Sequence, residues 1–453
     1  KTRLSEYFEN CLVIWEEQGE LQFNEIEIVN VHEEKIVLQK KESMPSKGAM
    51  ILIRPFNFLE NQGRIWFEEE SKEYALECVK KFMAFSEGSG EEEGFEGIEL
   101  KDPLREDQKK LGGILGKPFS FLWGPPGTGK TFTVGQGVAT YMKAFREKKV
   151  LLLANSNMAV DHALFKIDDA LGEEGRGCCK RVGKNYRPSD YENREHLLDE
   201  SNRELNTRLV EIELEKSKRV DSQEIDKLSK EYGEIKERLK GGMEGVEGKQ
   251  LIATTAFYFY YIMQNFENDF FDLIVVDEAS QMSLLNVLTL LPKGKSVLFT
   301  GDDKQLSPIR ISKEKETKRW FGESPFSYRE MNPCVMLTNQ NRMSERICEM
   351  VGESFYEGKL SIDERSLHDE GWRKERELEK GEDEKFKSPV SFWLAYKSKI
   401  EMGQWNERSV NKESAALVAF TLEDLLGEGL VPNHQDVCIL TPFHKQRAEI
   451  RKS

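Results

Sequence analysis

The first part of the chain alternates apolar and polar side chains, and this pattern changes further along. Over residues 1–70, apolar runs such as 11–15, 26–29 and 49–53 are separated by polar or Gly/Pro-containing turns. A period of two is typical of strands that are buried on one face. We therefore predict a small antiparallel β-barrel over residues 1–70, followed over 71–98 by one amphipathic helix and a linker rich in Gly and Glu.

From residue 117 onward, short apolar runs lead into polar or glycine-rich segments and then into helical patterns. These runs occupy residues 119–123, 149–153, 250–253, 273–276 and 296–300. Continuous runs without alternation are typical of parallel strands that helices cover on both faces. They predict an α/β fold with a parallel sheet, and a further run at 436–440 predicts the start of a second sheet.

A highly charged segment interrupts the α/β pattern, and we place an insertion at residues 190–245. Apolar residues recur there at spacings of three and four, and Gly241-Gly242 follows them. Two seams result, one with Leu198, Leu205, Leu209 and Ile212, the other with Ile225, Leu228, Tyr232, Ile235 and Leu239. The pattern predicts an antiparallel helical hairpin over 195–240. An exposed charged helix without a function explains the charge equally well.

Composition narrows the class of protein. The 453 residues are too many for one compact core and indicate two to four domains. With 66 Lys and Arg against 81 Asp and Glu, the net charge is −15, so any nucleic acid would have to bind in a local basic channel. No run approaches the roughly 20 apolar residues of a membrane helix. Seven cysteines without zinc spacing favour a reducing compartment, and we expect an intracellular protein, cytoplasmic or nuclear.

Residues 124–131 fit the pattern G-x-x-x-x-G-K-[ST] and directly follow the predicted strand at 119–123. In such a loop, glycines let backbone N–H groups turn toward phosphate oxygens, and the next helix adds positive potential at its N-terminus. Lys130 is expected to reach the β- and γ-phosphates of ATP, and the Thr131 hydroxyl to ligate Mg²⁺. The predicted nucleotide-binding residues are Gly124, Pro125, Pro126, Gly127, Thr128, Gly129, Lys130 and Thr131.

An acidic pair, Asp277 and Glu278, ends the predicted strand at 273–276. This position suits Asp277 as a ligand of Mg²⁺ and Glu278 as the group that polarises the attacking water. A solvated loop after a core strand is the alternative, but it leaves two matching motifs in one sheet unexplained.

Over nearly all of residues 100–450, the chain resembles the superfamily 1 helicases of the up-frameshift and senataxin-like branch. Asn155 stands where this family has proline, and Asn341 where it has tyrosine. The matching stretches are Leu-Arg-Glu-Asp-Gln at 104–108, Ala-Asn-Ser-Asn-Met-Ala-Val-Asp at 154–161, Thr-Thr at 254–255, Gly-Asp-Asp-Lys-Gln-Leu-Ser-Pro at 301–308, Gln-Asn-Arg-Met at 340–343, Phe-Tyr-Glu-Gly-Lys-Leu at 355–360 and Thr-Pro-Phe-His-Lys-Gln at 441–446.

The resemblance implies two RecA-like domains, at 99–332 and 333–453, and an ATP-driven motor that moves 5′ to 3′ on single-stranded RNA or DNA. It implies adenine contact for Gln108, γ-phosphate sensing for Gln305 and a catalytic role for Arg342, whose planar cationic donor suits a transferring phosphoryl group. The strand-binding residues implied are Ser156, Asn157, Thr254, Thr255, Thr441 and Pro442. The barrel and hairpin resemble the branch's accessory elements and are the expected contacts for a protein partner of a monomeric motor.

The family's last two motifs, a G-x-E strand contact and a T-R-A-x-x arginine finger, do not occur in this sequence. We therefore expect an incomplete second RecA-like domain. A P-loop ATPase switch for a protein partner, or an ATP-gated nucleic-acid clamp without unwinding, stays open as an alternative. The basic run at 181–187 is a further candidate strand contact, although simple surface exposure explains it equally well. The aromatic run at 257–261 is more typical of core than of base stacking.

Overall fold

The computed structural model describes residues 10–17, 20–32, 35–38, 51–55, 63, 65–67, 69–86, 97–183, 185–218, 222–238, 246–309, 314–376, 410–427, 429, 437–441 and 444–453. They form two compact units. Unit 1 comprises the described residues of Lys1–Leu104, Lys109–Leu122 and Thr131–Cys334. Unit 2 comprises those of Arg105–Gln108, Trp123–Lys130 and Val335–Ser453. The domain bounds given above stay predictions.

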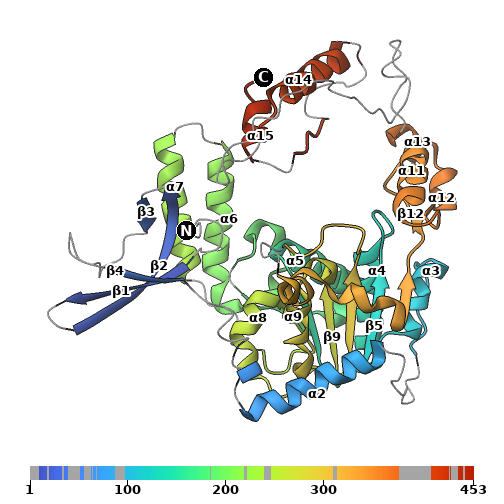
Figure 1. The fold of residues 1–453 in the computed structure, drawn as a ribbon, viewed down its shortest axis with the longest axis horizontal. Coiled ribbons are helices and arrows are strands. Elements are labelled where there is room, and N and C mark those ends of the chain that lie inside the picture. The colour runs from blue at the N-terminus through green and yellow to red at the C-terminus, as the bar shows by residue number, and fades with distance from the viewer. Residues whose placement is uncertain are drawn as a thin grey trace. The chain divides into compact units, whose positions relative to one another are not determined.

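A seven-stranded sheet forms the centre of unit 1, in the order β11-β5-β10-β9-β6-β8-β7. Its strands β5 and β9 are labelled in Figure 1. β6 pairs in parallel with β8 and β9, and β9 with β10, so the predicted parallel α/β sheet is confirmed. Every residue of β6, β9 and β10 is buried, which explains their unbroken apolar sequences. The strands are β5 (Phe119–Trp123), β6 (Val150–Ala154), β7 (Cys179–Arg181), β8 (Leu251–Thr255), β9 (Leu273–Asp277), β10 (Val297–Gly301) and β11 (Cys334–Met336), and β5 and β11 end in unit 2.

Helices follow several of these strands along the chain, and α4, α5, α8 and α9 are labelled in Figure 1. They are α4 (Lys130–Ala144) after β5, α5 (Asn157–Leu171) after β6, α8 (Ala256–Ile262) after β8 and α9 (Leu284–Leu288) after β9. The side chains of Ser156, Thr255 and Ser283 accept a backbone N–H at the start of α5, α8 and α9. These N-caps fix where each helix begins, which is at the carboxyl end of the preceding strand for α5 and α8.

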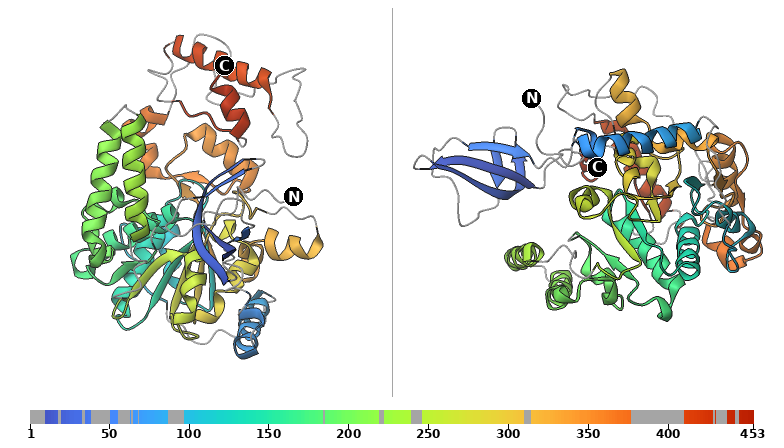
Figure 2. Two further views of the ribbon diagram at one scale, coloured as in Figure 1. Left: turned by 90° about the vertical axis from the view of Figure 1, so that its left-hand side faces the viewer. Right: turned by 90° about the horizontal axis from the view of Figure 1, so that it is seen from below.

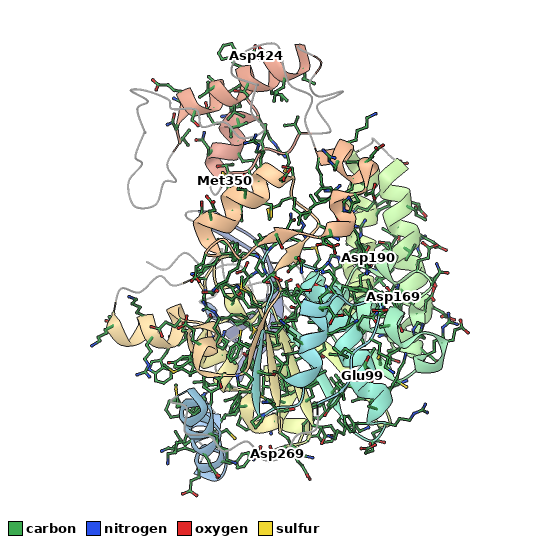
Figure 3. The ribbon with its side chains drawn as sticks, turned by 90° about the vertical axis from the view of Figure 1, so that its right-hand side faces the viewer. Glu99, Asp169, Asp190, Asp269, Met350 and Asp424 are labelled. Carbon is green, nitrogen blue, oxygen red and sulfur yellow. The ribbon has the colours of Figure 1, made fainter. Side chains whose placement is uncertain are left out.

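The helix α2 (Glu69–Ser86) belongs to unit 1 and confirms the helix expected within 71–98. The Tyr74 hydroxyl donates a hydrogen bond to Asp269, which is labelled in Figure 3. Phe82 is fully buried and meets the Phe119 ring edge to face, with centroids 5.1 Å apart. Aromatic packing of this kind makes α2 part of the core of unit 1 rather than a linker.

The N-terminal strands form a separate antiparallel sheet in the order β3-β2-β1-β4. They are β1 (Asn10–Glu17), β2 (Glu20–His32), β3 (Lys35–Leu38) and β4 (Ile51–Pro55). The antiparallel arrangement is confirmed. Closure into a barrel would join β3 to β4, a pairing that the described strand residues do not make, so the barrel stays a prediction.

The predicted hairpin is present as α6 (Arg203–Lys218) and α7 (Ser222–Arg238), which lie side by side in both views of Figure 2. Leu209 and Ile212 of α6 and Ile235 of α7 form a core cluster of their own. The first helix begins later than the sequence suggests, because residues 195–197 and 200–202 form short 3₁₀ turns.

Unit 2 contains a two-stranded parallel sheet and several helices. They are β12 (Asn339–Gln340), β13 (Ser361–Ile362), α11 (Glu345–Phe355), α12 (Glu364–Leu367), α13 (Glu370–Arg376), α14 (Lys412–Gly427) and α15 (His444–Ile450), besides the short α3 (Glu106–Lys109), which begins in unit 2. The strand predicted at 436–440 is wrong for the residues that the structure describes there: 437–440 form no strand, and Leu440 is 89% exposed. Throughout the described chain, no helix combines the length and apolar content needed to span a membrane.

Candidate functional site

The shape of the loop at 124–130 depends on glycine at three positions. Gly127 and Gly129 have φ angles of +78°, which residues with a Cβ rarely adopt. A Cβ on Gly124 would lie 2.7 Å from the Cβ of Lys130, so a side chain there would displace the lysine. Lys130 is the first residue of α4, where the helix dipole favours an anion. The loop therefore has the conformation that a phosphate cradle requires.

Arg105 holds this loop against the start of β12, all within unit 2. Its guanidinium donates to the carbonyl oxygens of Thr128 at 2.6 Å and Asn339 at 2.7 Å, and pairs with Asp363 at 3.2 Å. The side chains of Arg105 and Asp363 are 16% and 13% exposed. Sequence reasoning missed Arg105, since the motif drew attention to the glutamine three positions later. An arginine followed by two acidic residues just before that glutamine was the signal that could have found it.

Gln108 lies directly beside the phosphate loop. Its Nε2 donates to the Thr128 carbonyl at 3.2 Å, and its Oε1 accepts the backbone N–H of Arg105 at 3.0 Å. Asp107, its neighbour, accepts the backbone N–H groups of Thr338 and Asn339 at 3.0 and 3.3 Å. The predicted adenine contact of Gln108 stays a prediction, but its position next to the loop is as that role requires.

Arg342 stands in a tight loop that Gln340 organises. The Oε1 of Gln340, which is fully buried, accepts the backbone N–H groups of Arg342 at 2.8 Å and Met343 at 2.7 Å. The backbone N–H of Asn341 donates to the Gly127 carbonyl at 3.1 Å. A Cβ on Gly127 would lie 2.6 Å from the Cβ of Arg342. Unit 2 thus brings the phosphate loop and the predicted catalytic arginine into contact.

The acidic pair lies in unit 1 at the end of β9. Asp277 is 2% exposed, and its Oδ1 accepts from the Thr300 hydroxyl and, at 3.0 Å, from the backbone N–H of Glu278. Glu278 is partly exposed, with a left-handed φ of +54° that is uncommon for residues other than glycine. Gln281 Nε2 donates to its Oε2 at 3.1 Å. Backbone strain of this kind is characteristic of functional sites, because it aims a side chain that regular geometry would turn elsewhere.

The loop after β10 is joined to the loop after β9 by side chains. The Ser280 hydroxyl accepts the backbone N–H of Asp302 at 3.1 Å, and Asp302 accepts from Gln305 Nε2 at 2.8 Å. Burial raises the pKa of the neighbouring Asp303, although the Arg329 guanidinium at 2.8 Å acts in the opposite direction. Gln305, the predicted γ-phosphate sensor, is exposed. Its bond to Asp302 keeps it on the same edge of the sheet as the acidic pair.

Parallel register places the strand-binding motif and the acidic pair side by side. Ala154, the last residue of β6, pairs with Thr255 of β8 and with Asp277 of β9. Ser156 follows two residues later and is exposed, with its hydroxyl accepting the Ala159 N–H at 3.2 Å. Three neighbouring strands therefore end level with one another and carry the predicted strand and metal residues on one edge.

The remaining strand-binding candidates fall in different environments. Asn157 is the first residue of α5 and half-buried. Thr254 is fully buried, so Thr255 is the member of that pair with surface to offer. Thr441 lies in unit 2, and Pro442 lies outside the described residues.

Of two further runs singled out in the sequence, the basic run departs from expectation at Arg181 and the aromatic run largely agrees with it. Arg181, in the basic run at 181–187, is buried and paired with Asp161 at 2.6 Å, so a surface contact for this arginine is wrong. The aromatic run lies on α8, where Phe259 and Tyr260 are buried as core packing predicts, while Tyr261 is 51% exposed.

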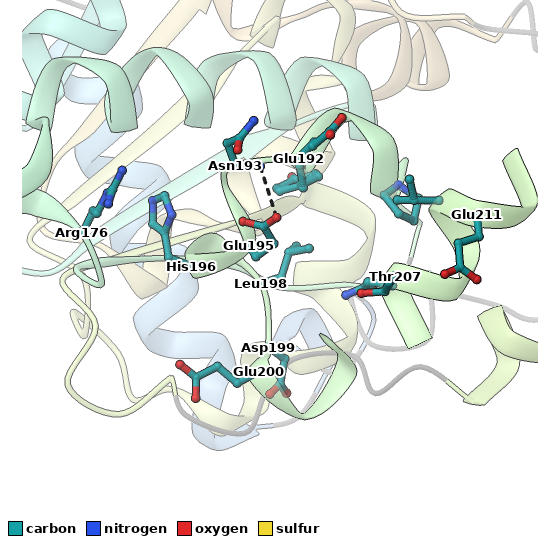
Figure 4. A pocket seen from close by; sticks show the side chains of 14 residues that line it. Arg176, Glu192, Asn193, Glu195, His196, Leu198, Asp199, Glu200, Thr207 and Glu211 are labelled. Carbon is teal, nitrogen blue, oxygen red and sulfur yellow. Dashed lines mark hydrogen bonds between the residues drawn. The ribbon is translucent and has the colours of Figure 1, made fainter. Parts of the chain in front are cut away.

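One cavity lies at the base of the hairpin in unit 1 (Figure 4). Its volume is about 680 Å³, and Tyr191, Leu198 and Val210 contribute apolar lining. Glu195, drawn in Figure 4, accepts the Asn193 backbone N–H at 3.2 Å. None of the predicted nucleotide-binding or strand-binding residues lines this cavity, so it is separate from the predicted site.

Comparison with known protein families agrees with the geometry. One family model, described as an AAA domain, matches residues 102–207 and 190–313, and a second with the same description matches residues 323–453. The chain carries the AAA domains of a superfamily 1 helicase. The resemblance found in the sequence is thereby confirmed.

The similar curated proteins are distant relatives of this helicase-type chain. An uncharacterized ATP-dependent helicase of Methanocaldococcus jannaschii is 26% identical over 317 residues, which cover 59% of this chain and 47% of the relative. The regulator of nonsense transcripts 1 homolog of Arabidopsis thaliana is 28% identical over 349 residues, 74% of this chain and 26% of its own length. The DNA polymerase alpha-associated DNA helicase A of Schizosaccharomyces pombe is 26% identical over 365 residues, 75% of this chain and 52% of its own. The chain spans about half or less of these relatives.

Among solved structures, the PRRSV helicase covers 78% of this chain and 51% of its own at 12% identity, with a TM-score of 0.31. That likeness is too weak to assign a role to any residue.

Proposed function

We propose that this protein is an ATP-driven motor that moves 5′ to 3′ on single-stranded RNA or DNA. The observation that supports it best is the level ending of β6, β8 and β9, which puts Ser156 and Thr255 on the same sheet edge as Asp277. A strand bound along this edge would lie next to the groups that respond to ATP. Small hydroxyl and amide groups at helix starts are suited to phosphate oxygens, which every single strand presents.

ATP binds, in this proposal, at residues 124–131. Lys130 neutralises the terminal phosphates, and Arg342, whose loop contacts Gly127, offers a second cation to the transferring phosphoryl group. Glu278 orients and deprotonates the attacking water, with Gln281 fixing its carboxylate. Gln305 senses the γ-phosphate and relays its presence to Asp302.

Magnesium fits the residues present. In the described part of the chain, no three His, Cys, Asp or Glu side chains cluster as a protein-only metal site would require. Mg²⁺ is commonly held by one or two protein oxygens together with substrate phosphates, and Thr131 and Asp277 supply oxygen ligands of the right kind. When bound, the ion would neutralise charge on the β- and γ-phosphates.

The test is the ATPase rate of the protein with matched 20-nucleotide RNA and DNA oligomers and with no strand, using Lys130→Ala as the inactive control. Stimulation by either strand, absent in the control, supports the motor. A rate that neither strand changes would refute it and favour a switch for a protein partner. Strand binding that depends on ATP without stimulated hydrolysis would instead indicate an ATP-gated clamp. A duplex substrate with a 5′ or a 3′ single-stranded tail then tests polarity.

A further inference from the structure

Arg181 is fully buried beside the predicted strand-binding motif at 154–161. Its guanidinium donates three hydrogen bonds. Its Nε donates to Asp161 Oδ1 at 2.6 Å, its Nη1 to the Val182 carbonyl, and its Nη2 to Asn157 Oδ1 at 2.8 Å. The Tyr191 hydroxyl also donates to Asp161 Oδ1, at 2.6 Å. A guanidinium held from three directions has little freedom to move.

This arrangement fixes which way the Asn157 amide faces. Arginine carries donors and no acceptor, so the atom of Asn157 that meets Nη2 has to be its carbonyl oxygen. The amide nitrogen, on the other side of the planar group, is therefore turned away from the buried arginine. Asn157 is half-buried at the start of α5, so the residue keeps some exposed surface at this end of the sheet.

We propose that Arg181 is a positioning residue for strand binding, which it serves by presenting the Asn157 amide N–H groups to a phosphate oxygen of a single strand. The proposal rests on the proposed function. If the Asn157 side-chain amide were free to rotate, either its oxygen or its nitrogen could face the phosphate. The oxygen would repel the phosphate. Arg181 removes the wrong orientation without touching the strand itself.

The same network extends to the inserted hairpin. The Tyr191 ring lies 5.3 Å from that of Tyr186, whose hydroxyl donates to Asn206 of α6 at 2.9 Å. Asn206 is itself 8% exposed. The hairpin is thus anchored to the residues that hold Arg181, which gives α6 a structural connection to the strand-binding motif.

The experiment measures single-strand affinity by fluorescence anisotropy with a labelled 20-nucleotide oligomer, using the whole protein. Asn157→Asp keeps an oxygen for Arg181 but replaces the outward donor by an acceptor. We expect its unfolding midpoint to match that of the wild type and its strand affinity to fall about 10- to 100-fold. Tyr191→Phe, the matched control, removes a hydroxyl from the network but leaves Arg181 on Asn157. Its strand affinity should stay within about twofold, even if the unfolding midpoint falls.

A double-mutant cycle separates positioning from structural support. Arg181→Lys retains the charge beside Asp161 but cannot fork to Asn157. Asn157→Ala should weaken binding about tenfold in the wild type and less than twofold in the Arg181→Lys background. If Asn157→Ala weakens strand binding equally in both backgrounds, the proposal is overturned. If Arg181→Lys does not fold, the test rests on Asn157→Asp, and an unchanged strand affinity in that variant would overturn the proposal. A wild-type protein that binds no strand would instead overturn the proposed function.

Discussion

Replacing Arg105 should loosen the phosphate loop from within unit 2. The change Arg105→Gln removes two charge-assisted hydrogen bonds, to Thr128 and Asn339, and the ion pair with Asp363. Hydrogen bonds of this kind contribute about 1.5–3 kcal/mol each, and breaking a buried ion pair costs about 3–5 kcal/mol. These contacts, and a longer one of 3.5 Å between Arg105 Nε and Asp107, share one side chain, so the values do not add.

The expected cost lies at the lower end of that range. Asp363 keeps a partner after the substitution, since it also accepts the backbone N–H of Arg365 at 2.9 Å. Both members of the pair are slightly exposed, which lets water replace part of the interaction. We therefore expect the free energy of local opening to fall by about 3 kcal/mol, which is roughly a hundredfold in hydrogen exchange.

The assay is amide hydrogen exchange at two reporters in unit 2. The Asn341 N–H donates to the Gly127 carbonyl at 3.1 Å, and the Leu337 N–H to the Trp123 carbonyl at 2.8 Å. Arg176→Gln is the control, because Arg176 is 59% exposed and pairs with Glu173 across one helical turn. Arg105→Lys should give an intermediate result, since one ammonium cannot reach three acceptors in a plane. Equal exchange in Arg105→Gln and Arg176→Gln at both reporters would refute the reasoning.

The other predictions concern the chemistry and one buried thiol. Lys130→Ala should lower the ATPase rate on the order of 10²- to 10³-fold, while Lys143→Ala, on the exposed part of the same helix, should leave it unchanged. Glu278→Gln should keep ATP binding, measured by nucleotide fluorescence, yet stop hydrolysis; loss of binding would contradict the role as base. Burial raises the pKa of the Cys348 thiol, so at pH 8 less of it is thiolate than in a free thiol, and buried Cys348 should react with a disulfide reagent far more slowly than exposed Cys334. Mass spectrometry of the labelled peptides checks this, and equal rates in the folded protein would count against the burial.

The strands that could be predicted from the sequence are those with a continuous run of apolar residues. β6 and β9 are buried at every position, and such a strand has to be continuously apolar. β7 escaped notice because two of its three residues, Lys180 and Arg181, are charged although buried. Charge is tolerated there since Asp161, twenty positions earlier, neutralises Arg181, and no local pattern reports a partner at that separation.

The site shows the same division between local and distant information. The phosphate loop and the acidic pair are contiguous motifs, and their backbone geometry follows from their own glycines and strand ends. Arg105 is different, because its acceptors lie 23 positions away at Thr128, 234 at Asn339 and 258 at Asp363. The run at 436–440 shows the opposite failure, since its apolar sequence permits a strand but its described residues, 437–440, form none.

The position of β6 between β8 and β9 would connect strand binding with ATP chemistry in the proposed motor. β6 is hydrogen-bonded on one side to β8 and on the other to β9, in register along all five of its residues. A displacement of Asp277 would strain the hydrogen bonds between β9 and β6, and Ala154, which pairs with Asp277, would be displaced first. From Ala154 the chain takes two residues to Ser156 and three to Asn157, whose amide Arg181 holds from below. Because packed sheets are stiff, a small shift at Asp277, the proposed metal ligand, would be transmitted to the proposed strand-binding side chains rather than absorbed between them. Because β6 alone connects Asp277 with Ser156 and Asn157, no further structural element is needed to couple them.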